Sequence, residues 1–225
     1  MTSAAISLVL ELRTSLETYE RIAGYSVRVS PSQFGSERSI VNEDLALVRR
    51  CLDGDEAGVR EFIERFQGLV FSVCWRMLGH REDAEDVAQE VFARAFRHLD
   101  NWDGQRPLKP WVLTIATNRC RTALEKRAKL PVASEIVEQA AERREHSQQR
   151  HDEIDWAEEL QLALSELRDD YRQVFVLFHQ QELSYEEIGE ILQCPQGTVK
   201  TWLFRARAQL AARLRERGLI EEAQT

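Results

Sequence analysis

Phe204 and Arg205, together with Lys200, form the clearest candidate binding surface in the sequence. Four apolar residues recur at spacings of four, three and four, which place them on one stripe of a helix: Val199, Leu203, Ala206 and Leu210. The opposite face then consists of Gly197, Thr201, Phe204, Arg205 and Ala208. A large aromatic ring and an arginine beside small residues suit a helix that enters the major groove of DNA. The alternative is a helix that packs against another protein.

The residues in front of this helix predict a helix-turn-helix. Ser184 and Glu187 have the spacing of a capping box, which marks the start of a short helix with an apolar stripe. A tight break follows at Gln193-Cys194-Pro195, directly before the candidate binding helix.

A second candidate surface lies on a basic helix that begins near Pro107 to Pro110. Its outward side chains are predicted to be Thr114, Thr117, Asn118 and Arg121, preceded by Asn101, Trp102 and Trp111. Hydroxyl, amide and guanidinium groups beside tryptophans are suited to holding unstacked bases. Trp102 and Trp111 could instead anchor the core, and for Trp111 we favour that role.

A third candidate surface is the polar side of the helix over residues 81–99. Glu82, Asp86, Glu90 and Arg97 lie opposite its apolar stripe, with Gln89 beside them. A flat acidic face of this kind suits docking against a basic partner helix. A face that simply contacts water is the alternative.

Other kinds of chemistry find no support in the sequence. The four cysteines stand singly, and neither a zinc-site spacing nor a known nucleophile or phosphate-loop motif occurs. We expect no enzyme, no metal and no cofactor. No apolar run has the roughly 18 residues of a membrane span, and the N-terminus lacks a cationic signal region, so we expect a cytoplasmic protein that does not insert into membranes.

The charge of the chain is divided between neighbouring helices. The net charge of -8 on 225 residues excludes a cationic coat over the whole protein. Residues 81–103 nevertheless hold seven acidic and three basic residues, whereas 105–130 hold seven basic and one acidic. The same alternation recurs between residues 182–190 and 196–217. Two such pairs favour binding of a polyanion on the basic helices and of a protein on the acidic ones.

Helical periodicity dominates the sequence, which predicts an all-α protein of two small helical domains. We place an N-terminal extension at 1–41, a helical domain at 42–130, a flexible acidic linker at 131–157, a second helical domain with the helix-turn-helix at 158–218, and a tail at 219–225.

Three stretches, in this order and spacing, resemble the bacterial extracytoplasmic-function (ECF) sigma factors. They are DAEDVAQEVFARAFRHLDNWDG (83–104), WVLTIATN (111–118) and LSYEEIGEILQCPQGTVKTWLFRARAQL (183–210). The resemblance implies sigma region 2 as a helical bundle and sigma region 4 as a helix-turn-helix. It also implies binding to core RNA polymerase, at the β′ clamp helices and the β flap, and to promoter DNA in double- and single-stranded form. An anti-sigma factor is a further implied partner.

The resemblance also assigns roles to residues. The acidic helix would bind core polymerase through Asp86, Gln89 and Glu90. The melted minus-ten element would be held by Asn101, Trp102, Thr114, Thr117, Asn118 and Arg121. The minus-thirty-five element would be read by Thr198, Lys200, Thr201, Phe204 and Arg205.

Two other functions stay open on the sequence alone. A stand-alone helix-turn-helix regulator would bind duplex DNA without polymerase, usually as a dimer. An all-α adaptor would bind only proteins, and its function would not depend on Phe204 and Arg205 contacting DNA.

Overall fold

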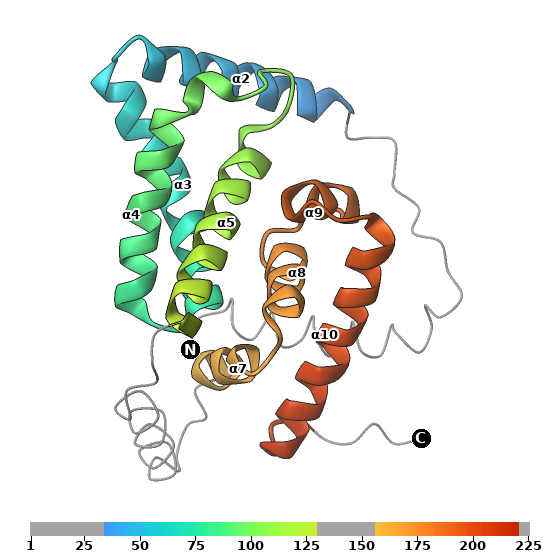
Figure 1. Cartoon of the computed structure of the whole chain (residues 1–225). Coiled ribbons are helices and arrows are strands. Elements are labelled where there is room, and N and C mark those ends of the chain that lie inside the picture. The colour runs from blue at the N-terminus through green and yellow to red at the C-terminus, as the bar shows by residue number, and fades with distance from the viewer. Residues whose placement is uncertain (1–33, 130–155, 221–225) are drawn as a thin grey trace.

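The structure, a computed structural model, describes residues 34–129 and 156–220, and every regular element in these ranges is a helix (Figure 1). The N-terminal bundle consists of α2 (Phe34–Leu52), α3 (Glu56–Leu78), α4 (Arg81–Arg97) and α5 (Leu108–Lys129), with the short 3₁₀ turn η2 (Leu99–Asn101) after α4. The C-terminal domain consists of α7 (Trp156–Ser165), α8 (Asp169–His179), α9 (Tyr185–Leu192) and α10 (Gln196–Glu216). The all-α prediction is therefore confirmed.

Local sequence signals fix the ends of α3. The Asp55 carboxylate accepts a hydrogen bond from the Ala57 amide at 3.0 Å and caps the helix start. Gly79 ends the helix in the left-handed conformation, with φ of 78°, which glycine adopts without steric cost. The buried side of α3 includes Phe62, Phe66, Val70, Val73 and Met77.

Helix α2 is fastened to the rest of the bundle by one buried carboxylate. Asp44 accepts a hydrogen bond from the Leu108 amide at 2.6 Å, at the start of α5, and pairs with Arg65 of α3 at 2.6 Å. Because α2 begins at Phe34, residue 42, the predicted start of the domain, lies inside this helix.

The helix-turn-helix forms as the sequence predicts. Ser184 and Glu187 make both hydrogen bonds of the capping box, and Gln193 ends α9 with φ of 53°. The turn comes so close to α9 that a Cβ at Gly189 would lie 2.8 Å from the carbonyl oxygen of Cys194. Glycine at this position therefore allows the tight connection between α9 and α10.

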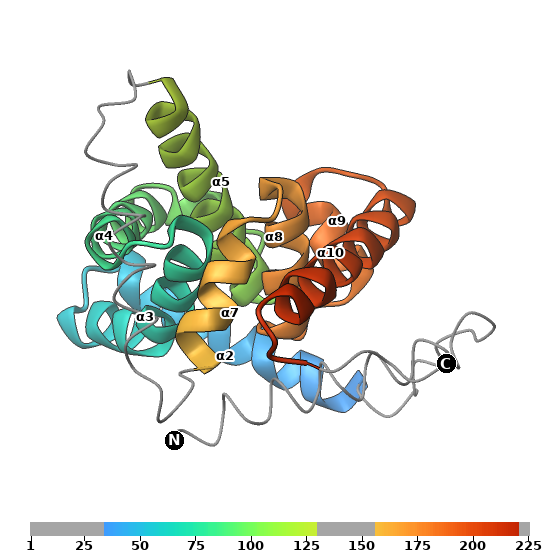
Figure 2. The same ribbon diagram turned by 90° about the horizontal axis from the view of Figure 1, so that it is seen from below.

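The two domains lie against each other, and their buried apolar side chains form one continuous core. Helix α3 packs against α7 and α8, and α5 packs against α9. Figure 2 shows α7 beside α3 from below. Of the predicted extension (1–41), linker (131–157) and tail (219–225), residues 1–33, 131–155 and 221–225 lie outside the described residues.

Candidate nucleic-acid and protein interfaces

The exposed face of α10 has the composition that its periodicity predicts. Val199, Leu203, Ala206 and Leu210 are buried, which confirms the predicted apolar stripe. The predicted outer side chains are all exposed, and Phe204, at 48%, is one of the few large apolar side chains that face solvent in the described residues. Because Arg205 is exposed on the same face, an aromatic and a cationic side chain are both accessible to a ligand there.

Neighbouring helices orient the long side chains of this face. Arg205 Nη1 lies 3.2 Å from the Tyr171 hydroxyl of α8, and Lys200 Nζ lies 5.6 Å from the ring centre of Tyr185. Thr201 donates its hydroxyl hydrogen to its own helix, at Gly197, and Thr198 is half-buried at the helix start. Because an arginine has five N–H donors, the contact with Tyr171 leaves others for a ligand.

A half-buried histidine of α8, His179, contacts α10. Arg207 of α10 donates from Nε to His179 Nε2 at 3.1 Å, and the imidazole lies against the Phe175 ring with centroids 4.6 Å apart. Burial, reinforced by the charge of Arg207, lowers the pKa of His179 to about 4. The imidazole is therefore neutral at physiological pH.

This lowered pKa predicts that the protein loses stability in mild acid. Between about pH 6.5 and about pH 4 the unfolded chain takes up a proton at His179 that the folded chain does not, so the free energy of unfolding falls as the pH falls. The loss attributable to His179 should reach roughly 3 kcal/mol at the acid end of this range. Urea unfolding at several pH values measures it. The variant His179→Gln should show a weaker pH dependence.

Helix α5 presents the second candidate surface only in part. Asn118 is exposed, and Thr114 and Arg121 are half-buried. Thr117 is 1% exposed and donates its hydroxyl hydrogen to the Leu113 carbonyl at 2.9 Å, so its predicted outward orientation is wrong. Helical periodicity missed this because α5 is covered on one side by its own bundle and on another by α9.

The two remaining candidates, Asn101 and Trp102, lie in the turn before α5 and differ in exposure. Asn101 is exposed and donates to the Asp100 carboxylate at 3.1 Å. Trp102 is 8% exposed and packs into the core, and its buried Nε1 has no hydrogen-bond partner among the described residues. Trp111 is half-buried against the core, in the anchoring role that its sequence context favours.

The polar face of α4 is exposed along its length, as predicted. Glu82, Asp86, Gln89, Glu90 and Arg97 all face solvent. Glu90 forms an ion pair with Arg119 of α5, which fixes the carboxylate between the two helices. For Asp86 no ion pair or hydrogen bond is present within the described part of the chain, so its charge is available to a partner.

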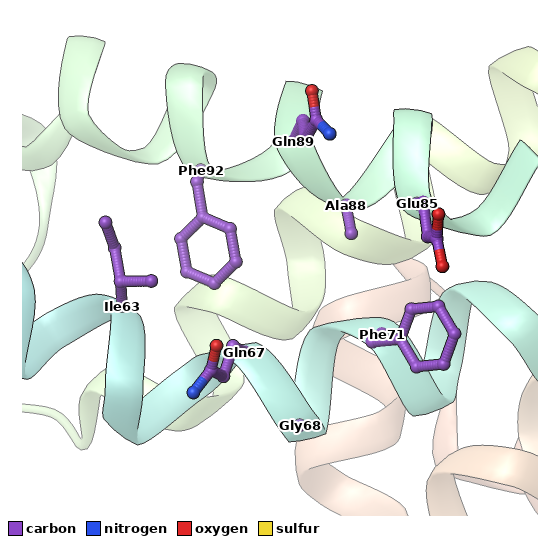
Figure 3. A pocket seen from close by; sticks show the side chains of 8 residues that line it. All are labelled: Ile63, Gln67, Gly68, Phe71, Glu85, Ala88, Gln89 and Phe92. Carbon is purple, nitrogen blue, oxygen red and sulfur yellow. The ribbon is translucent and has the colours of Figure 1, made fainter. Parts of the chain in front are cut away.

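An open groove beside this face was not predicted from the sequence. It lies between α3 and α4 and is lined on its apolar part by Ile63, Phe71 and Phe92 (Figure 3). Glu85 and Gln89 of α4 and Gln67 of α3 border it. The periodicity of α3 places Ile63 on the same stripe as Phe62 and Phe66, but it is 36% exposed. The acidic face and the groove together form a surface on which an amphipathic helix could dock.

In the described residues no helix is long and apolar enough to cross a membrane. In the same ranges, no group of histidine, cysteine and acidic side chains is placed to hold a metal ion.

Comparisons with known proteins identify both halves of the chain. Residues 62–130 match Sigma-70 region 2, and residues 157–210 match Sigma-70, region 4. SigW, an ECF RNA polymerase sigma factor of Bacillus subtilis, is 32% identical over 182 residues, covering 75% of this chain and 95% of SigW. The RNA polymerase sigma-H factor of Pseudomonas aeruginosa is 31% identical over 192 residues, covering 80% of this chain and 97% of that protein.

Solved structures show the same fold. CnrH, in complex with the cytosolic domain of CnrY, superposes with a TM-score of 0.57 at 24% identity, covering 77% of this chain and 97% of CnrH. The sigma factor RpoE of Bartonella quintana, in complex with the anti-sigma factor NepR, gives a TM-score of 0.55 at 21% identity, covering 69% of this chain and 96% of RpoE. From the two matched regions and from relatives that this chain covers almost completely, it follows that the chain belongs to the ECF sigma factors, which act in transcription initiation by RNA polymerase.

Proposed function

We propose that this sigma factor binds core RNA polymerase through α4 and reads its promoter through α5 and α10. The observation that carries the proposal is the pair of exposed faces, one acidic on α4 and one aromatic and cationic on α10, in a single chain. Neither a protein adaptor nor a stand-alone DNA-binding regulator needs both. The factor itself would act by binding in the cytoplasm and would catalyse no covalent step.

The α4 surface fits a helical partner on polymerase. Asp86, Gln89 and Glu90 would contact the β′ clamp helices, as the family resemblance implies, and the apolar groove would take a hydrophobic side of the same partner. The charge of Asp86 favours a basic partner helix, while Ile63, Phe71 and Phe92 supply apolar area that water leaves on binding.

The DNA-binding roles are divided between the domains. Helix α10 would enter the major groove of the minus-thirty-five element with Lys200, Thr201, Phe204 and Arg205, with Thr198 at its start. Asn101, Asn118 and Arg121 would hold bases of the melted minus-ten element, with Thr114 beside them. Trp102 and Thr117 would support this surface from inside, because both side chains are buried.

An anti-sigma factor is a further proposed partner. Such a protein is implied by the family resemblance, and among proteins of the same fold RpoE is in complex with an anti-sigma factor. It would compete with polymerase for the α4 surface or for the DNA-binding surfaces.

Run-off transcription with purified core polymerase tests the proposal. On a library of promoter fragments, we expect transcript starts that require this protein and that share a two-part motif. The variant Asn118→Ala should reduce transcription from duplex promoters and be rescued on templates already melted at the minus-ten element, because the contact of Asn118 with unpaired bases would offset the cost of melting, which such templates do not carry.

Two results would contradict the proposal. If no start depends on the protein while the protein alone shifts a specific duplex, a stand-alone regulator explains the chain better. If it neither supports transcription nor binds DNA, the adaptor function is favoured.

A further inference from the structure

The start of helix α5 is capped by a residue of another helix. Helix α5 begins at Leu108, and Pro107 before it has no side-chain oxygen that could accept a hydrogen bond. The acceptor comes instead from Asp44 of α2, whose Oδ2 lies 2.6 Å from the Leu108 nitrogen, although the two residues are 64 positions apart. A carboxylate in this place also lies at the positive end of the helix dipole. Helix α2 is therefore bonded directly to the first turn of α5.

The Asp44 carboxylate is fixed from a second side. Its side chain is 1% exposed, and its other oxygen, Oδ1, lies 2.6 Å from the guanidinium of Arg65 on α3. A buried charge that loses one of its partners is unfavourable, because no water replaces that partner. Displacement of the Leu108 amide from Asp44 is disfavoured for this reason.

Helix α2 also contacts the turn that leads from α4 into α5. A Cβ at Gly104 would lie 3.0 Å from Leu45 Cδ1 and 3.7 Å from the Trp102 ring, so the backbone of the turn lies closely against Leu45 of α2. Helix α2 packs against η2 as well, and Figure 1 shows it across the end of the bundle where α4 leads into α5. The turn is therefore held by α2 at its start, in its middle and at its end.

The same turn presents part of the proposed minus-ten surface. Asn101 is exposed at its start, whereas Trp102 beside it is buried. Within the turn, the Asp103 carboxylate accepts a hydrogen bond from the Gln105 amide at 3.0 Å. The position of Asn101 relative to α5 thus depends on how the turn is held. The matched sigma region begins at residue 62, so it assigns no role to α2.

We infer that α2 positions the minus-ten surface, with Asp44 as the positioning residue. The inference rests on the proposed role of Asn101 and α5 in holding melted DNA. Asp44 is buried and touches no base, so it acts through the turn and the start of α5. The apparent affinity for the melted strand is reduced by the fraction of chains whose turn is in place. A helix that precedes the matched region would thereby contribute to promoter melting.

Asp44→Ala, compared with Asp44→Asn, tests the inference in the full chain. Hydrogen–deuterium exchange of the backbone amides over residues 98–108 measures how firmly the turn is held, without DNA or polymerase. We expect faster exchange there in Asp44→Ala, because the Leu108 amide loses its acceptor. Asp44→Asn keeps an oxygen that can accept this hydrogen bond, so its exchange should stay closer to that of the wild type.

Transcription with core polymerase measures the consequence for function. On a duplex promoter recovered by the run-off screen, Asp44→Ala should lower transcription about tenfold, because a hydrogen bond to a charged group holds the turn in place. Asp44→Asn should recover most of this loss. In the double variant Asp44→Ala/Asn101→Ala, the loss should be smaller than the product of the two single losses, because both residues act through one turn.

Asp55→Ala is the matched control. Asp55 also caps the start of a helix, α3, through the Ala57 amide, and it also pairs with an arginine, Arg50, at 2.8 Å. Its exchange over residues 98–108 and its transcription should match those of the wild type. If circular dichroism shows that Asp44→Ala does not fold, Leu45→Ala carries both measurements with smaller effects, because it removes only the contact with Gly104.

Two results would overturn the inference. One is exchange over residues 98–108 that is no faster in Asp44→Ala than in Asp55→Ala. The other is a pair of losses that multiply fully in the double variant, which would mean that Asp44 does not act through Asn101. Faster exchange with unchanged transcription would instead refute the proposed role of Asn101 and α5 in holding melted bases.

Discussion

Asp86→Lys is expected to abolish transcription that depends on this protein. The Asp86 carboxylate faces solvent on α4, the helix whose Glu85 and Gln89 border the groove, and has no partner among the described residues. Reversing its charge would place like charges together against the basic polymerase helix proposed as its partner, at a cost of about 3 kcal/mol or roughly a hundredfold in affinity. Binding of the full chain to core polymerase, followed by fluorescence anisotropy, measures the loss directly.

Asp53→Lys is the matched control for this variant. Asp53 is exposed in the turn between α2 and α3, at the opposite end of α3 from the start of α4, and the charge change is the same. It should bind polymerase like the wild type. Equal losses in the two variants would mean that net charge, and not the α4 surface, governs polymerase binding. Glu90 is less suitable for this test, because its ion pair with Arg119 also joins α4 to α5.

Arg205→Ala is expected to weaken promoter recognition selectively. The guanidinium is exposed on the outer face of α10 and is oriented by the Tyr171 hydroxyl at 3.2 Å. A good arginine contact to a base contributes about 1 to 3 kcal/mol of discrimination, so transcription from the preferred promoter should fall between about fivefold and a hundredfold. The preference for one base pair in the minus-thirty-five element should relax in the same variant, as sequencing of selected promoters would show.

Arg215→Ala separates base reading from general attraction to DNA. This arginine is exposed near the end of the same helix, and its loss changes the net charge equally. The Arg215→Ala variant should lower the affinity for every promoter sequence by the same factor, or leave it unchanged. Its base preference should be that of the wild type. If the base preference is unchanged in Arg205→Ala, Arg205 does not read the minus-thirty-five element. Phe204 would then be the next position to test on α10.

Sequence periodicity correctly predicted which faces of α4 and α10 point outward, although it did not predict helix α2. Apolar spacing depends only on the helical repeat, so the exposure of Asp86, Phe204 and Arg205 could be predicted without any knowledge of packing. Capping chemistry is equally local, and the Ser184–Glu187 box formed as predicted. The alternation of acidic and basic helices could also be predicted, because the charge of a segment is a property of its composition.

What covers α5 and what lies beside α4 depend on how the helices pack. Thr117 is buried, and Arg121 is engaged by Gln173, a residue 52 positions further along the chain. The groove beside Ile63 exists because two helices meet at a particular distance and angle, which no single helix encodes. Contacts between distant residues depend on how whole elements pack, whereas periodicity reports only how one element faces its surroundings. For that reason the sequence indicated two helical domains, and the structure alone revealed that they pack against each other around one continuous core.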